Sequence, residues 1–244
     1  MQTESMTIGL KFTEPLLGSR PGNPEVTRDF IASRVTEDAG GHTDAEQKAK
    51  ADEEVKVSEA QVEEGIQNAS TVFAKDDNGL FVYDYTMRGF IKGALSAFID
   101  LGEAPKELNP WNYKGVVDRF VFVFPRRIYL KTPTGENWRK AEQTLERSLR
   151  ATTMRGDRVA LARSEMLPEG TNCQFEVRIL IATPRTKTMK KTGEVVPVKS
   201  SAVITLDLIR SCFDYAQLNG FGQWRSGGYG RATWEEIKSG AVAK

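Results

Sequence analysis

The residues best suited to chemistry lie in a glycine-rich stretch, Gly220 to Arg231, near the end of this 244-residue chain. Its glycines let the backbone approach a ligand closely or adopt positive φ angles. Tryptophan and tyrosine rings can stack on nucleobases, and arginines can meet phosphates. The stretch lacks GxxxxGK[ST] and follows a predicted helix, which excludes a P-loop and a dinucleotide fingerprint. A tight turn that only packs this helix on a sheet is the alternative. The candidate contacts are Gly222, Trp224, Arg225, Gly228, Tyr229 and Arg231.

A second candidate lies at the start of a predicted amphipathic helix over residues 90–100, with Gly102 as its stop. Arg88 and Lys92 are expected in the first turns of this helix. Free N–H groups and a partial positive charge at a helix N-terminus favour phosphate binding. The alternative is that Lys92 is an ordinary exposed lysine and that Gly93 is a packing contact.

The third candidate is residues 126–163, which hold ten Lys/Arg against four acidic residues. Cations spaced along a surface can neutralise successive phosphates without reading sequence. The candidates taken from this region are Arg126, Arg127, Arg155 and Arg158. A solvated helix over 139–150, held by pairs such as Glu146–Arg150 at i,i+4, is the competing interpretation.

Catalytic and metal-binding constellations are sparse. The single histidine, His42, lies in a polar, low-complexity segment, where a solvated role is expected. Cys173 and Cys212 cannot form a disulfide framework or a zinc site, so buried, reduced thiols are expected. We therefore expect no catalytic residue, no metal and no cofactor, and we lean against enzymatic activity.

Charge is divided along the chain although the net charge is only +1. Residues 1–70 hold 14 acidic and 7 basic residues, and the remainder holds 19 acidic and 27 basic residues. An acidic front section and a basic body suggest a polyanionic partner. Residues 20–68 are predicted to form an acidic insertion, either a solvated helix over 43–67 or a mobile segment. No apolar run is long enough for a membrane span or a signal peptide, so a cytoplasmic protein without a membrane partner is expected.

The remaining elements supply a scaffold for these candidates. Strands are predicted at 6–13, around the turn Asp77–Gly79, at 117–130 as a central strand, and at 173–183. Residues 185–199 are expected to form a loop or protruding hairpin, and residues 202–219 a β-like start that continues as a helix. Without insertions the order approaches β-α-β-β-α-β. This predicts one α+β domain, 1–244, with a ferredoxin-like (RRM-like) core.

Three segments together resemble the RAMP superfamily of CRISPR effector proteins. The glycine-rich stretch, between a helix and a strand, looks like the family's C-terminal glycine-rich loop. Residues 83–95, YDYTMRGFIKGAL, resemble its (S/T)xxKGxLR-like strand-to-helix element. Residues 165–179, EMLPEGTNCQFEVRI, resemble its acidic-Leu-Pro-x-Gly lead into a strand. Their order and separation also fit the family.

The resemblance implies a subunit of an antiviral defence complex that binds single-stranded RNA, including guide RNA, through its backbone. It also implies self-association along RNA or contacts with other effector subunits. It assigns Arg88 and Lys92 to RNA contact and a thumb-like insertion to 126–164. Two alternatives stay open. One is a metal-dependent endoribonuclease that uses an insertion aspartate, and the other is a non-catalytic interaction protein whose acidic arm docks a basic partner. The aspartate candidates are Asp29, Asp38, Asp44 and Asp52.

Overall fold

A four-stranded antiparallel sheet forms the centre of the protein. The computed structural model describes residues 2–22, 71–153, 156–181, 186–188, 195–197 and 203–238. The sheet has the order β14-β1-β11-β7, built from β14 (Ala232–Ile237), β1 (Gln2–Phe12), β11 (Asn172–Ile181) and β7 (Val121–Phe124). Helices α3 (Asp84–Leu101) and α5 (Leu206–Asp214) connect β1 to β7 and β11 to β14. This is the split βαβ arrangement, so the predicted α+β class with a ferredoxin-like core is confirmed.

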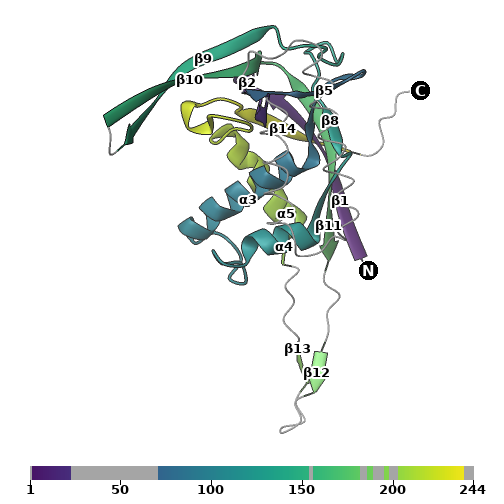
Figure 1. The fold of residues 1–244 in the computed structure, drawn as a ribbon. Helices are drawn as coiled ribbons and strands as arrows, with labels where there is room; N and C mark the ends of the chain where they lie inside the picture. Colours follow the sequence, from purple (N-terminus) through teal and green to yellow (C-terminus); the bar gives the residue numbers. More distant parts are fainter. Residues whose placement is uncertain are drawn as a thin grey trace, which may run out of the picture.

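The hydrophobic core lies between this sheet and its helices (Figure 1). Met6, Ile8, Leu10 and Phe12 alternate along β1 and are all buried, as the period-2 pattern of the sequence predicts. Ile91 and Leu95, one turn apart on α3, belong to the same cluster. The alternating strand and the helical stripe therefore bury their apolar faces against each other.

Helix α3 is longer than its apolar periodicity predicts. It begins at Asp84, six residues before the predicted start, and its first backbone N–H donates to the carbonyl oxygen of Arg126 over 2.9 Å. It ends as expected at Gly102, whose left-handed φ of 76° suits a glycine C-cap. A contact with a distant segment thus fixes the start of α3, while the local sequence fixes its end.

The prediction of a central strand over 117–130 is wrong. Helix α4 (Tyr113–Phe120) takes the first part, and β7 pairs only with β11, at the edge of the sheet. Short apolar runs do not distinguish strand from helix by periodicity alone. After Pro125, which has no amide hydrogen to continue a ladder, β8 (Arg127–Tyr129) pairs instead with β6 (Gly79–Tyr83). Strand β5 (Ala74–Asp76) completes this second sheet, in which β5 and β6 form the predicted hairpin.

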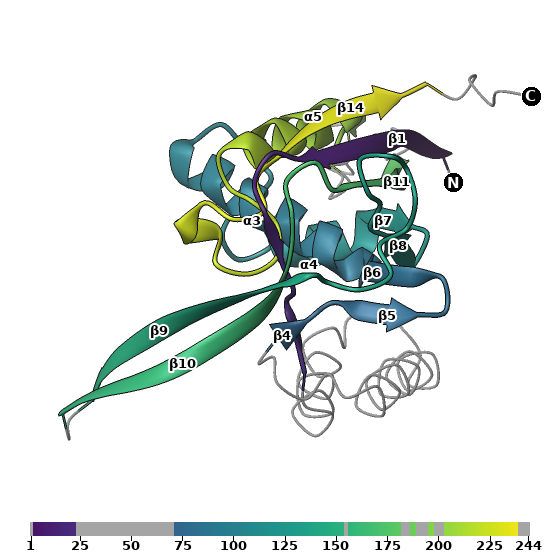
Figure 2. The same ribbon diagram turned by 90° about the horizontal axis from the view of Figure 1, so that it is seen from above.

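The basic region folds as a long hairpin. Strands β9 (Gln143–Thr153) and β10 (Gly156–Leu167) pair from Gly156 opposite Thr153 to Met166 opposite Gln143. Figure 2 shows this hairpin projecting away from the central sheet. The interpretation of 139–150 as a helix is therefore wrong, because cross-strand pairing outweighs the i,i+4 charge pattern. At its base, β10 pairs with β2 (Leu16–Leu17) and β4 (Thr71–Val72).

Smaller elements complete the described structure. Strand β3 (Arg20–Pro21) pairs with β4. Strand β12 (Thr186–Thr188) pairs with β13 (Val195–Pro197), which favours the hairpin over the loop for residues 185–199. Residues 203–205 are not a strand, contrary to expectation; Thr205 instead caps α5 by accepting from the Leu208 N–H over 3.2 Å. Two 3-10 turns, η1 (Tyr215–Gln217) and η2 (Arg225–Gly227), follow.

The acidic insertion and a membrane span are the two remaining features that the sequence analysis considered. Residues 23–70, nearly all of the predicted acidic insertion, lie outside the described residues, as do His42 and the four candidate aspartates. Within the described ranges, no helix is both long enough and apolar enough to cross a membrane.

Candidate nucleic-acid interface

Close backbone contacts shape the glycine-rich loop. The Phe221 N–H donates to the Gly230 carbonyl oxygen over 2.9 Å, and the Gly230 N–H donates to that of Pro15, also over 2.9 Å. A Cβ at Gly220 would lie 2.1 Å from the Tyr229 carbonyl oxygen, and one at Gly222 would lie 2.7 Å from that of Leu17. These contacts match the tight-turn alternative. Gly222 therefore packs against β2. At Gly228, whose φ is 88°, the nearest atom lies 3.8 Å from the position that a Cβ would take.

An aromatic stack stands at the tip of this loop. The rings of Trp224 and Tyr229 lie 5.1 Å apart between centroids, at 17° to each other. The guanidinium of Arg147, on β9, lies 4.6 Å from the centre of the Trp224 ring. Trp224 has the positive φ of 51°, and Gly227 lies directly against its ring, which leaves no room for a Cβ. With 38% of Trp224 exposed, the loop and the hairpin together present an aromatic surface beside a cation.

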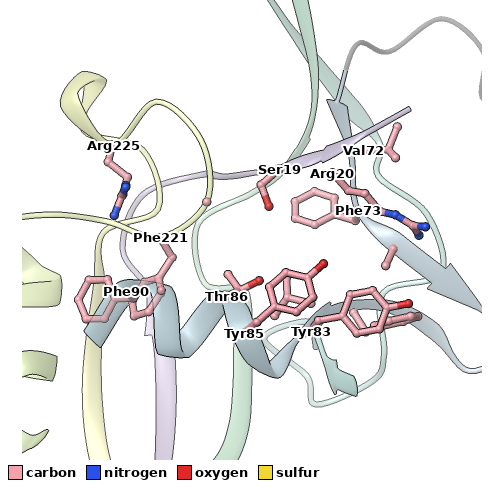
Figure 3. Close-up of a pocket in the computed structure, with 15 residues that line it drawn as sticks. Ser19, Arg20, Val72, Phe73, Tyr83, Tyr85, Thr86, Phe90, Phe221 and Arg225 are labelled. Atoms are coloured by element: carbon pink, nitrogen blue, oxygen red, sulfur yellow. The ribbon is translucent and has the colours of Figure 1, made fainter. Parts of the chain in front are cut away.

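Arg225 and Arg231 are the loop's exposed cations. Among the described residues, neither has a carboxylate within ion-pairing distance. A guanidinium nitrogen of Arg225 lies 3.5 Å from the position that a Cβ of Gly93 would take, so the side chain runs along α3. Figure 3 shows it extending from the loop toward that helix. The structure thus brings together the loop and the 83–95 motif, two of the three segments that carry the resemblance.

The third segment, residues 165–179, begins at the end of β10 and contacts the residues that lead into and out of the 23–70 gap. A carboxylate oxygen of Glu165 accepts from the Phe73 N–H over 2.8 Å, and its carbonyl oxygen accepts from the Gly18 N–H over 2.9 Å. Burial raises the pKa of this carboxyl group above its ordinary value. Gly18 leads from β2, against which Gly222 packs, so segments far apart in sequence meet around residues 16–20.

Arg88 and Lys92 do not lie at a helix N-terminus. Since α3 begins at Asp84, they are its fifth and ninth residues, beyond the backbone N–H groups that lack helical partners. Both already meet carboxylates. A guanidinium nitrogen of Arg88 lies 3.3 Å from Asp84, and the Lys92 ammonium lies 2.6 Å from Asp118 on α4. The prediction that these two residues lie in the first turns of the helix, beside its free N–H groups, is therefore wrong. Both side chains are half-buried.

Arg126 and Arg127 also have structural partners. Arg126 lies 3.7 Å from Asp84 and 5.0 Å from the centre of the Tyr83 ring. Arg127 lies 2.8 Å from Asp76. Burial acts to raise the pKa of Asp76, but hydrogen bonds from Tyr129 and Arg127 outweigh it, and the pKa is lowered. Arg127 therefore holds the β5–β6–β8 sheet together.

The last two candidates lie on the hairpin. Arg155 is outside the described residues. For Arg158 the structure gives only a strand position, opposite Ala151 in the β9–β10 pairing.

A cavity of about 210 Å³ lies between the start of α3, the β5–β6 hairpin and the glycine-rich loop (Figure 3). Stacked aromatic pairs line it: Tyr83 with Tyr85 at 5.3 Å, and Phe90 with Phe221 at 4.0 Å. Sequence reasoning missed this cavity, although residues 83–95 contain three of these rings. Ser19 and Arg20, which also line it, lie in a Pro- and Gly-rich stretch that carries no signal.

Metal-binding groups and cysteines are the remaining side chains with possible chemistry in the described ranges. There, no three His, Cys, Asp or Glu side chains gather into a group that could hold a metal ion. Cys173 and Cys212 are buried, unpaired thiols, as predicted. The glycine-rich loop thus presents two exposed cations, Arg225 and Arg231, on the same segment as the stacked Trp224 and Tyr229 rings.

No protein-family model matches the sequence, and no curated protein matches it either. Among solved structures, the chain is similar to one from a structure entitled "Type IV-B CRISPR Complex". The superposition has a TM-score of 0.40 and 9% sequence identity, and covers 99% of this chain and 93% of that one. A likeness at this level is too distant to carry a functional assignment.

Proposed function

We propose that this protein binds single-stranded RNA through its backbone, as a subunit of a CRISPR-type ribonucleoprotein. The observation that carries the proposal is the loop surface formed by Trp224, Tyr229, Arg225 and Arg231, with Arg147 beside it. The bases of a single strand can stack on the two rings. Its phosphates can bind Arg225 and Arg231, which have no carboxylate partner among the described residues. The three RAMP-like segments, which meet around residues 16–20, support the class of complex.

Charge also favours a polyanion. Residues 71–244 hold 27 basic and 19 acidic residues. The β9–β10 hairpin projects from the central sheet (Figure 2), and Arg147 on β9 lies 4.6 Å from the centre of the Trp224 ring of the loop. Contacts of this kind do not depend on sequence, which suits a subunit that covers different RNAs. Self-association along RNA, contacts with other effector subunits and a cytoplasmic location belong to the same proposal.

Arg88 and Lys92 take a secondary place in this proposal. Their partners Asp84 and Asp118 already occupy the positions in which a phosphate would sit. A phosphate that approaches α3 has to displace these carboxylates. The glycine-rich loop is therefore the first contact, and the α3 cations join when the acidic partners give way.

The direct test compares the double variant Arg225→Ala/Arg231→Ala with the wild type. Fluorescence anisotropy with a labelled oligouridylate gives Kd at several salt concentrations. Removing one phosphate-binding cation reduces the slope of log K against log salt by ~0.7 for single strands. The double variant should therefore bind more weakly, with a slope shallower by ~1.4 than that of the wild type.

The control variant is Arg178→Ala/Arg210→Ala, which removes the same charge from β11 and α5. Both arginines have carboxylate partners there, Glu176 at 2.9 Å and Asp207 at 2.6 Å. It should keep the wild-type slope. Wild-type affinity and slope in the Arg225/Arg231 variant would instead favour the interaction-protein alternative, in which the loop only packs.

A further inference from the structure

The cavity beside α3 has the composition of a site for one flat aromatic ligand. At about 210 Å³ it is smaller than the ~300–1,000 Å³ of typical drug-sized sites. Six of its fifteen lining residues are aromatic, with Phe73 and Phe90 buried and Tyr85 half-buried. The Thr86 and Ser19 hydroxyl groups add polar positions that can donate or accept.

Charge at the ends of the cavity narrows the ligand class. Arg225 lines one end and Arg20 the other, as Figure 3 shows. Arg225 is exposed on the glycine-rich loop, whereas Arg20 is only 6% exposed. An aromatic slot with a cation at its mouth suits a nucleobase whose attached phosphate stays outside.

Gly89 is the lining residue at which a larger side chain can test the cavity. It is an exposed residue of α3 that lines the cavity, and no atom lies within 4 Å of the position that its Cβ would take. A side chain there would lean toward the helix N-terminus, over the residues three and four positions earlier. Those residues are Thr86 and Tyr85, which both line the cavity.

We propose that this cavity takes one nucleobase turned out of the bound single strand, with the adjoining phosphate on Arg225. The inference rests on the proposed function, because it places one base of the same RNA. Stacking against aromatic walls tolerates any base, since each base has a π-face. The site thus adds affinity for base-bearing strands without adding a sequence preference.

The test uses two ligands on the full chain, an oligouridylate and an abasic strand of equal length. Wild-type protein should prefer the base-bearing strand, because its bases stack on Trp224 and Tyr229 and one base occupies the cavity. Gly89→Leu should lower that preference by about 5- to 150-fold, the contribution of one stacked base, while the salt dependence of binding stays unchanged. The matched control is Gly115→Leu on α4, another exposed helical glycine with no neighbour within 4 Å of its Cβ position.

Three outcomes separate the two proposals. A preference that falls by the contribution of one base in Gly89→Leu, and not in Gly115→Leu, supports the base site. If Gly89→Leu keeps the wild-type preference, the base site is overturned and RNA binding stands. If wild-type protein binds neither strand at low salt, both proposals fail. Thermal melting checks that each variant folds, which is expected because leucine has a higher helix propensity than glycine.

Discussion

The ammonium group of Lys92 on α3 lies 2.6 Å from a carboxylate oxygen of Asp118 on α4. The same aspartate lies 3.9 Å from a guanidinium nitrogen of Arg88. One carboxylate therefore pairs with both cations that the RAMP resemblance assigns to RNA contact. Under the proposed function, this carboxylate and an RNA phosphate compete for the same side chains.

Replacing this aspartate should strengthen RNA binding. Asp118→Asn removes the competing charge, so a phosphate reaches Lys92 and Arg88 without displacing a carboxylate. We expect the salt slope to increase by ~0.7 for each additional phosphate bound and Kd to fall. Anisotropy titrations across salt concentrations measure both. The control is Asp207→Asn, which removes an exposed acid from α5. Affinity in Asp118→Asn that is equal to or below that of the wild type would exclude competition at this site.

The close packing of the glycine-rich loop predicts an unequal response to alanine. Gly220→Ala would place a Cβ 2.1 Å from the Tyr229 carbonyl oxygen, so the backbone has to move. We expect a decrease of about 1–3 kcal/mol in the free energy of unfolding. For a chain of this size that lowers Tm by several degrees. Gly115→Ala, in open space on α4, should stabilise by up to ~1 kcal/mol. Equal Tm values for the two variants in a thermal melt would contradict this packing.

The two cysteines should be unreactive in the folded protein. Burial raises the pKa of Cys173 and of Cys212 to about 12, so neither forms the nucleophilic thiolate at pH 8. A thiol-reactive disulfide reagent should label neither residue in native protein and both after denaturation. Rapid labelling of the native protein at either position would show that its surroundings open.

The half-buried carboxyl group of Glu165 predicts a pH dependence of stability. Burial raises its pKa above the ordinary value of 4.5, so the folded state favours the protonated form. The stability linked to this group is fully present below pH 4.5 and is lost as pH rises through the folded pKa. Glu165→Gln can keep the acceptor for the Phe73 N–H without the charge. Its Tm relative to wild type should rise from pH 4 to pH 7, and a constant difference would argue against the assignment.

Local patterns in the sequence determined most of the core. Alternating apolar residues specify β1, the turn at Asp77–Gly79 specifies the β5–β6 hairpin, and Gly102 ends α3. Each depends on interactions within a few residues, such as side-chain alternation or a left-handed glycine. The order of these elements was enough to predict a ferredoxin-like sheet. The residue types of the loop at 220–231 likewise marked it as the candidate site.

Contacts between distant segments decided the rest. The Arg126 carbonyl accepts the first N–H of α3, which moves the helix start to Asp84 and takes Arg88 and Lys92 away from its terminus. Pairing with β10 makes β9 a strand where local charge spacing favours a helix. Asp118, Arg147 and the cavity beside Gly89 became part of the site only through packing of α4, β9 and the glycine-rich loop around α3. The energy of an ion pair or a ring stack depends on the distance between the groups in space. The spacing of residues along the sequence therefore does not show which distant residues will pair.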